Sequence, residues 1–501
     1  MQHRILIPAC LAILLCFGAC TTNQPAQTAP IAAETTEESA AETPTVNAAE
    51  ETEPATEQQQ QPDSGRSQSK SDNKSDSKND KKSDGKNEKK SENKSDKKSE
   101  NKSDKKSDGK SSADGTDGEA TGAQNAATVL NDGDALTGGT YTATGTDESA
   151  LEASGSVTAT VTGAVIDKSA GGASSADASS FTGVNAGVRV YGNANVTLTD
   201  CTVTASAENA TGVFAYQNGV VTLVDCTVTV TGGGAGGVQV AGGGTLYGYN
   251  LIVTSASKAA IRSDRGGGTL LIDGGTYTAT GANGCPAIYS TADITVQNAD
   301  CVSTNSRAVI IEGKNSVTLE NCTLSGNDQS SKEGSVRANV LLYQSASGDA
   351  SVGTSVFTMT GGSMKANTGA MFYCTNTASV INLENAELLL SDDGTLLIVS
   401  TGRWGKDGKN GGDCTLNAKN QTLTGDTAVD AISSLTMNLS DGSSYTGTIT
   451  GEGKITVALD ASSTWTLTGD SYVTALDGDL GGIQLNGYTL YVNGVAWDGT
   501  K

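Results

Sequence analysis

The stretch VTLTDCTV, at residues 196–203, decides the fold. Apolar side chains alternate with threonine on both sides of a single aspartate, and the pattern returns as VTLVDCTV at 221–228 and VTLENCTL at 317–324. Alternation with a period of two predicts a β-strand that has one buried face. Asp and Asn tolerate the left-handed backbone region, which β-branched residues avoid. The motif therefore predicts two short strands joined at a one-residue corner.

A residue of the corner type recurs along most of the chain. Each one is Gly, Asn or Asp, the types that adopt a positive φ angle most readily. The predicted corners are Gly138, Gly163, Asp200, Asp225, Asn250, Gly274, Asp300, Asn321, Gly361 and Asn385. Their commonest spacing is about 25 residues, and a repeat of this length indicates stacked coils. Because the corner residue changes among three types, we interpret the series as a requirement of backbone geometry and not as a row of catalytic acids.

One coil, residues 186–212, contains three strand-like segments separated by short turns. Parallel strands connected by one continuous winding favour right-handed crossovers. The predicted fold is therefore an all-β, right-handed parallel β-helix, a solenoid with coils of about 25 residues. We expect this β-helix over residues 126–450, followed by C-terminal β coils or a cap over 451–501.

The segments GVRVY at 187–191 and GVFAY at 212–216 resemble strands of the first sheet in the pectin-lyase-like β-helix superfamily. The one-residue corner resembles the asparagine-ladder turn of the same superfamily. The segments STWTLTGDS at 463–471 and NGYTL at 486–490 resemble the closing segment of β-helical bacterial adhesins and autotransporter passengers. The resemblance implies a bacterial surface protein, and it implies that an enzymatic site would lie on the outer face of the first sheet.

The N-terminus has the features of an export signal. Arg4 precedes a short apolar run, and FGAC at 17–20 resembles the lipobox of bacterial lipoproteins. This resemblance implies a signal peptide over residues 1–19 and a diacylglyceryl group on Cys20. The expected protein is exported, anchored to the cell membrane by lipid and exposed at the surface. Residues 20–125 combine low hydrophobicity with dense charge, which predicts a disordered, low-complexity linker.

Charge and cysteine content restrict the partners. The formal net charge is −23, and such acidity disfavours nucleic acid. His3 is the single histidine of the sequence and no CxxC pair occurs, so we expect neither metal nor cofactor. We place Cys201, Cys226, Cys301 and Cys322 at one repeated coil position and expect buried thiols there. Disulfides between adjacent coils are the alternative.

The outward side chains of the predicted first sheet form a row rich in aromatic residues and arginine. The candidate ligand contacts are Arg189, Tyr191, Phe214, Tyr216, Arg262 and Tyr289. Exposed Tyr and Arg suit stacking on sugar rings and contact with proteins. In the alternative interpretation, these side chains stabilise the sheet surface across coils. The inserted loops 325–337 and 402–413 are expected to form a rim on this face.

Catalysis on polysaccharides by hydrolysis requires two carboxyl groups that flank the bond. No two acids occupy neighbouring outward positions of the predicted first sheet. We therefore expect a non-catalytic adhesin, or a binder of glycan or extracellular protein ligands, without catalytic residues. Two alternatives stay open. The first is a polysaccharide lyase or glycoside hydrolase whose acids converge only in the folded protein, and the second is a passive structural stalk.

Overall fold

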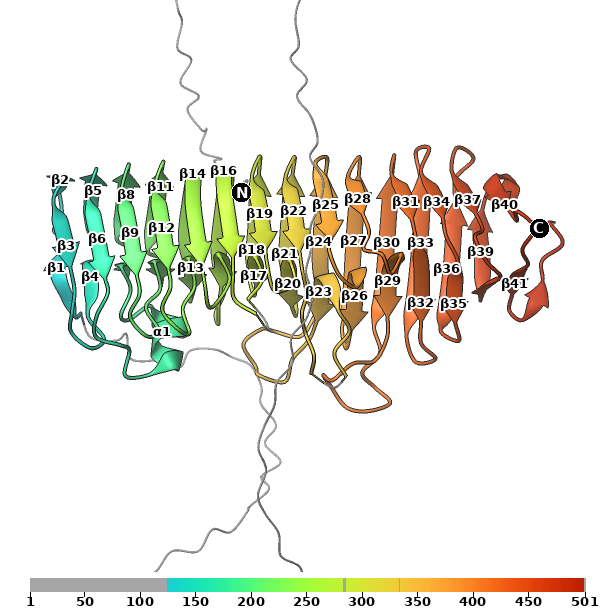
Figure 1. Ribbon diagram of the computed structural model, residues 1–501, viewed down its shortest axis with the longest axis horizontal. Coiled ribbons are helices and arrows are strands. Elements are labelled where there is room, and N and C mark those ends of the chain that lie inside the picture. The colour runs from blue at the N-terminus through green and yellow to red at the C-terminus, as the bar shows by residue number, and fades with distance from the viewer. Residues whose placement is uncertain (1–123, 283–284, 333, 500–501) are drawn as a thin grey trace, which may run out of the picture. The chain divides into compact units, whose positions relative to one another are not determined.

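The computed structural model describes residues 124–282, 285–332 and 334–499, and these residues form a parallel β-helix (Figure 1). Successive coils stack so that equivalent strands hydrogen-bond to each other in parallel register. The predicted parallel β-helix is thereby confirmed. The predicted signal peptide, Cys20 and nearly all of the predicted linker lie outside the described residues.

The first sheet, called sheet A, has 13 strands, and all of its neighbouring pairs are parallel. Its strands are β1 (Ala126–Val129), β4 (Ser149–Ser154), β7 (Val188–Tyr191), β10 (Val213–Tyr216), β13 (Val238–Ala241), β15 (Ile261–Ser263), β17 (Ile288–Ser290), β20 (Val309–Glu312), β23 (Ala338–Tyr343), β26 (Ala370–Thr375), β29 (Thr395–Val399), β32 (Asp426–Val429) and β35 (Ile449–Gly451).

The second sheet, called sheet B, has 22 strands and contains the two strands that flank each corner. Its strands are β2 (Ala135–Thr137), β3 (Thr140–Thr142), β5 (Thr158–Thr162), β6 (Val165–Lys168), β8 (Asn195–Thr199), β9 (Thr202–Ala205), β11 (Val220–Val224), β12 (Thr227–Val230), β14 (Gly244–Ser255), β16 (Gly268–Ala279), β18 (Asp293–Gln297), β19 (Asp300–Ser303), β21 (Ser316–Glu320), β22 (Thr323–Gly326), β24 (Ser355–Thr360), β25 (Ser363–Ala366), β27 (Ala378–Glu384), β28 (Glu387–Leu389), β30 (Asp413–Lys419), β33 (Ser434–Ser440), β36 (Lys454–Leu459) and β39 (Ala475–Gly478).

The last coils add two small sheets. One contains β31 (Thr422–Thr424), β34 (Ser444–Thr446), β37 (Thr464–Thr466) and β40 (Ile483–Gln484), and the other contains β38 (Ser471–Val473), β41 (Leu490–Val492) and β42 (Val495–Ala496). The described helices are α1 (Ala176–Thr182) and the 3-10 helix η1 (Leu480–Gly482). Parallel winding thus continues past residue 450, and the antiparallel pair β41–β42 follows it.

The core consists of aliphatic ladders that run from coil to coil. Leu198 of β8 pairs with Leu223 of β11, and both side chains are fully buried while the threonines beside them point outward. Each Leu or Val buried in this way contributes about 1.5–3 kcal/mol of transfer free energy. The alternation therefore fixes which face of every strand points inward.

The corners have the predicted backbone conformation at nine of the ten positions. The φ angle is 54° at Asp200 and 53° at Asp225 and Asn250, and Gly138, Gly163, Gly274, Asn321, Gly361 and Asn385 are also positive. Between two of these corners, Asn250 Nδ2 donates to Asp225 Oδ1 at 3.2 Å. The corner series is thus a feature of backbone geometry, with side-chain contacts between some of its members.

The predicted corner at Asp300 is wrong. Asn298 has the positive φ angle of 53° in that coil, whereas Asp300 lies in β19 and pairs with Thr276. The buried residues before it explain the difference: Ile294 and Val296 point inward, and the corner lies two residues after the last inward residue, as Asp200 does after Leu198. Asp and Asn both tolerate a corner, so the strand register selects between them.

This shift also moves one cysteine. Cys301 pairs with Leu324, so the prediction that it shares the coil position of Cys322 is wrong. Cys201 and Cys226 do occupy equivalent positions in adjacent coils, because the strands on both sides of them are in register. All seven described cysteines are buried free thiols, which agrees with their expected role as small apolar side chains.

Candidate functional site

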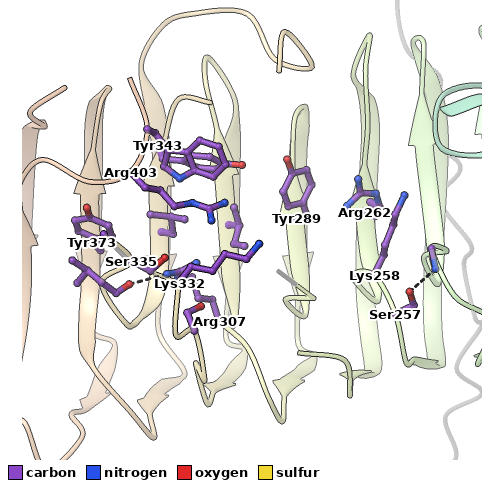
Figure 2. A pocket seen from close by; sticks show the side chains of 17 residues that line it. Ser257, Lys258, Arg262, Tyr289, Arg307, Lys332, Ser335, Tyr343, Tyr373 and Arg403 are labelled. Atoms are coloured by element: carbon purple, nitrogen blue, oxygen red, sulfur yellow. Dashed lines mark hydrogen bonds between the residues drawn. The ribbon is translucent and has the colours of Figure 1, made fainter. Parts of the chain in front are cut away.

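A cavity of about 420 Å³ lies over the outer face of sheet A (Figure 2). Its floor is a row of one residue per strand, made of Arg262, Tyr289, Ile310, Leu341 and Tyr373. These residues belong to β15, β17, β20, β23 and β26, and each pairs in register with the next. Because paired strands are about 4.8 Å apart, the row forms a continuous surface along five coils.

Two inserted loops form the wall of this cavity. The loop between β22 and β23 contributes Lys332 and Ser335, and the loop between β29 and β30 contributes Arg403 and Trp404. The Trp404 ring contacts the Tyr343 ring with centroids 5.2 Å apart, and the Arg403 guanidinium lies 4.1 Å from the Trp404 ring centre. The expectation that loops 325–337 and 402–413 form a rim on this face is confirmed.

The lining carries a strong positive charge. Its basic residues are Lys258, Arg262, Arg307, Lys332 and Arg403, and the lining residues that the structure describes include no Asp or Glu. Carboxylates outside the lining hold two of the cations: Arg262 pairs with Asp264 at 2.7 Å and Arg307 pairs with Asp328 at 3.0 Å. A local cluster of cations in an acidic protein creates a field that attracts anionic groups.

A buried carboxylate orients the tyrosines of the cavity. Glu312 is 1% exposed and accepts hydrogen bonds from the hydroxyls of Tyr289, at 2.6 Å, and Tyr343, at 2.9 Å. Burial raises the pKa of both phenols, so the rings stay neutral. The Arg262 guanidinium lies 4.5 Å from the centre of the Tyr289 ring. The rings are therefore held as fixed aromatic surfaces, and Glu312 is occupied by its hydroxyl partners.

Lys258 lies at the α1 end of the cavity beside Arg262 (Figure 2). Its ammonium donates a hydrogen bond to Ser180 Oγ, which belongs to α1. Burial, and after it the positive charge of Arg262, together lower the pKa of Lys258 to about 8. This lysine is therefore a cation that releases its proton more readily than an exposed lysine.

Four of the six candidate contacts are buried, contrary to the expectation. The exposed fractions are 1% for Arg189, 0% for Phe214, 8% for Tyr191 and 5% for Tyr216. Helix α1 lies against this part of sheet A. Arg189 Nε donates to the Thr182 carbonyl at 2.8 Å.

The approach of α1 depends on its C-terminal glycine. Gly183 has a φ angle of 73°, and a Cβ atom there would lie 2.5 Å from the Phe214 ring. The helix begins after Ser175, whose side chain accepts from the Ala178 amide. Ser175 and Gly183, the two cap residues, are the sequence signal that indicates α1. Because α1 covers Arg189 and Phe214, the same signal indicates that these residues of the row are buried.

Arg262 and Tyr289 are the two predicted contacts that the structure brings together in the cavity. The lining residues that sequence reasoning missed are Lys258, Arg307, Lys332, Tyr343, Tyr373 and Arg403. Tyr373 could have been found by extending the outward row of sheet A from Tyr289 through three more coils. The basic residues of the loops carry no periodic signal, so the folded structure was required to place them.

No known protein-family model matches this chain, and a search of curated proteins found no similar protein. Within residues 124–282, 285–332 and 334–499, no three His, Cys, Asp or Glu side chains converge as a metal site would require. In the same residues, no helix has the length and apolar content needed to cross a membrane.

Proposed function

We propose that this protein is an exported, lipid-anchored surface protein whose β-helix binds an anionic carbohydrate in the cavity over sheet A. The carrying observation is the composition of that cavity, in which five cationic side chains surround aromatic rings and no described lining residue is acidic. Guanidinium and ammonium groups form charge-assisted hydrogen bonds with carboxylate or sulfate groups. Tyr and Trp rings offer flat apolar faces that suit sugar rings.

The geometry favours binding over cleavage of the glycosidic bond. Hydrolysis of that bond uses two carboxyl groups on opposite sides of it, separated by about 5–10 Å. Among the described residues, two carboxylates contact the side chains of the floor and already have partners there: Asp264 pairs with Arg262, and Glu312 accepts from the Tyr289 and Tyr343 hydroxyls. A binding role that leaves the glycosidic bond intact is therefore the simplest function for this cavity.

The anchor belongs to the proposal as well. Cys20 in its lipobox-like context would hold the N-terminus at the membrane, and the charged segment that follows would separate the β-helix from the bilayer. Replacing Cys20 by Ser in the producing cell should abolish incorporation of labelled fatty acid and release the protein from the membrane fraction. Unchanged labelling would contradict the anchor and leave the cavity proposal untouched.

The binding test uses the purified full chain and isothermal titration calorimetry. Tetragalacturonate, which carries carboxylates, should bind at least 10-fold more tightly than neutral cellotetraose, because each charge-assisted contact is worth about 1.4 kcal/mol or more. The variants Arg262→Met and Trp404→Ala should each weaken binding by roughly 10- to 100-fold. Added salt should weaken binding of the acidic sugar.

A control variant removes an aromatic residue elsewhere. Tyr472 of β38 is 44% exposed and stacks on Tyr491 with centroids 4.9 Å apart, outside the cavity. Tyr472→Ala should leave binding unchanged. Equal affinity for the acidic and neutral sugars, or a Trp404→Ala variant that binds like the parent protein, would refute the proposed site. Absence of binding to any glycan would favour a structural stalk, and release of shorter sugars would favour a lyase or hydrolase.

A further inference from the structure

Ser180 of α1, which is 6% exposed and is not itself a lining residue, contacts Lys258 at the α1 end of the cavity. Ser180 Oγ accepts a hydrogen bond from Lys258 Nζ, and Lys258 is part of the cavity lining. A serine hydroxyl in contact with a lysine amine is one of the known solutions for a nucleophile and its base, because the amine can remove the hydroxyl proton when it is neutral. The carbohydrate binding proposed above does not use this contact, because it needs only the positive charge of Lys258.

The serine is held in a fixed position. The Ser180 carbonyl accepts from Gln239 Nε2 at 2.8 Å, and the neighbouring Ser179 Oγ donates to the Asn209 carbonyl at 2.6 Å. On the far side of the helix turn, the Arg265 guanidinium lies 4.1 Å from the centre of the Phe181 ring. Three contacts to three different coils therefore fasten α1 to the β-helix and leave Ser180 Oγ beside the lysine.

The lysine is suited to act as a base. Its pKa of about 8 results first from burial and then from the nearby charge of Arg262. At pH 7 about one Lys258 amine in ten is neutral, against roughly one in 3,000 for an unperturbed lysine. The neutral fraction available for proton removal is thus about 300-fold larger.

We propose that Ser180 and Lys258 form an acyl-transfer dyad that hydrolyses ester groups carried by the bound carbohydrate. Lys258 Nζ removes the hydroxyl proton while Ser180 Oγ attacks the ester carbonyl carbon. The bond to the sugar oxygen then breaks, and that oxygen takes the proton from the Lys258 ammonium. Water, deprotonated by Lys258 in turn, attacks the acyl carbon. The bond to Ser180 Oγ then breaks and Oγ takes the proton back from the Lys258 ammonium, so that one ester and one water give one carboxylic acid and one free sugar hydroxyl.

Arg262 has a defined part in this step. Asp264 Oδ2 accepts from Arg262 Nε at 3.1 Å and from Arg262 Nη2 at 2.7 Å, so the guanidinium is held at the same end of the cavity as Lys258. Its positive charge would stabilise the oxyanion that forms on the ester oxygen. The reaction spares the glycosidic bond, which agrees with the absence of acidic residues from the described lining.

The first experiment treats the full chain with a fluorophosphonate probe, which phosphonylates activated serines, and locates the modified peptide by mass spectrometry. Labelling is expected at Ser180, and it should disappear in Ser180→Ala. Ser174→Ala is the matched control, since Ser174 is exposed near α1 and its hydroxyl donates to Asp147 at 2.6 Å. Labelling at other serines only, or no labelling, would overturn the dyad.

The second experiment measures hydrolysis of p-nitrophenyl acetate and of acetylated tetragalacturonate. Lys258→Arg keeps the positive charge but cannot act as a base at neutral pH, so the rate should fall at least 100-fold while the melting temperature stays near that of the parent protein. The parent rate should rise with pH to a plateau above about pH 8, following Lys258. A Lys258→Arg variant as fast as the parent protein would overturn the proposal.

The ester substrate rests on the proposed carbohydrate function, but the two ideas fail separately. The fluorophosphonate and p-nitrophenyl acetate assays need no sugar, so they report on Ser180 and Lys258 alone. Binding of unesterified tetragalacturonate by the parent protein reports on the cavity alone. Loss of sugar binding with intact labelling would refute the carbohydrate and keep the dyad, and the opposite pattern would refute the dyad.

Discussion

The corner at Asn298 and the nearby strand residue Asp300 give a sharp test of what holds a coil together. Both side chains are exposed, but Asn298 has a φ angle of 53° and Asp300 lies in β19. A left-handed backbone costs a residue with a Cβ atom roughly 1–2 kcal/mol, and most for a β-branched one. Asn298 Nδ2 also donates to Asp273 Oδ1 at 2.7 Å, a contact worth about 1 kcal/mol.

Asn298→Val should therefore lower the free energy of unfolding by roughly 2–3 kcal/mol. Asp300→Val should change it by less than about 0.5 kcal/mol, because valine suits an exposed strand position. Asn298→Gly removes the same hydrogen bond but permits the positive φ angle, so its loss should be smaller than that of valine. The difference between the Val and Gly variants isolates the cost of the backbone conformation.

Urea denaturation of the full chain, followed by circular dichroism, measures these differences as shifts of the midpoint at a common slope. In a solenoid the coils can unfold in separate steps, so hydrogen exchange of the amides in β18 and β19 should accompany the denaturation curves. Equal destabilisation by Asn298→Val and Asp300→Val would refute the assigned corner. So would a glycine variant as unstable as the valine variant.

The remaining predictions concern buried charges and thiols. Arg189→Met should destabilise the protein by about 3–5 kcal/mol, because it leaves the buried Glu152 carboxylate unpaired. Burial raises the pKa of Glu152, so the penalty appears as the pH rises through that folded-state pKa. Denaturation at pH 4 should therefore show a smaller loss of stability than denaturation at pH 7. Binding of tetragalacturonate should weaken about tenfold between pH 7 and pH 9 as Lys258 loses its charge, and Lys258→Arg should abolish this dependence in calorimetry. The hydrogen bond between Cys374 and Cys414 and their burial raise the pKa of the Cys414 thiol, so iodoacetamide should modify both cysteines only in denaturant, as mass spectrometry can establish.

The fold was predictable because each coil repeats two independent signals, the alternation of inward residues and the corner type. Where the two signals disagreed, as at Asp300, the alternation of Ile294 and Val296 was the better guide. The inward alternation is recorded by every second residue of a strand, so it fixes the register. A single Asp, Asn or Gly is weaker evidence for a corner, because these residues also occur at other positions of the chain. The error was therefore local, and it changed the position of Cys301 without changing the fold.

The site was predictable only where it lies on the repeat. Arg262 and Tyr289 could be placed because they belong to the outward row of sheet A. Arg189 and Phe214 belong to the same row, but a seven-residue helix outside the repeat covers them. Trp404 lies in a loop without periodicity, so its position over the row depends on tertiary contacts such as that with Tyr343.

The position of α1 limits the direction in which a long ligand can lie. The helix occupies the outer face of β7, β10 and β13, and the two inserted loops stand over β23 and β26. The open stretch between them comprises β15, β17 and β20, which is roughly 15 Å along the axis of the solenoid. A polymer cannot thread lengthwise through such a window. It must cross the stack of coils along the strands, or offer only its chain end.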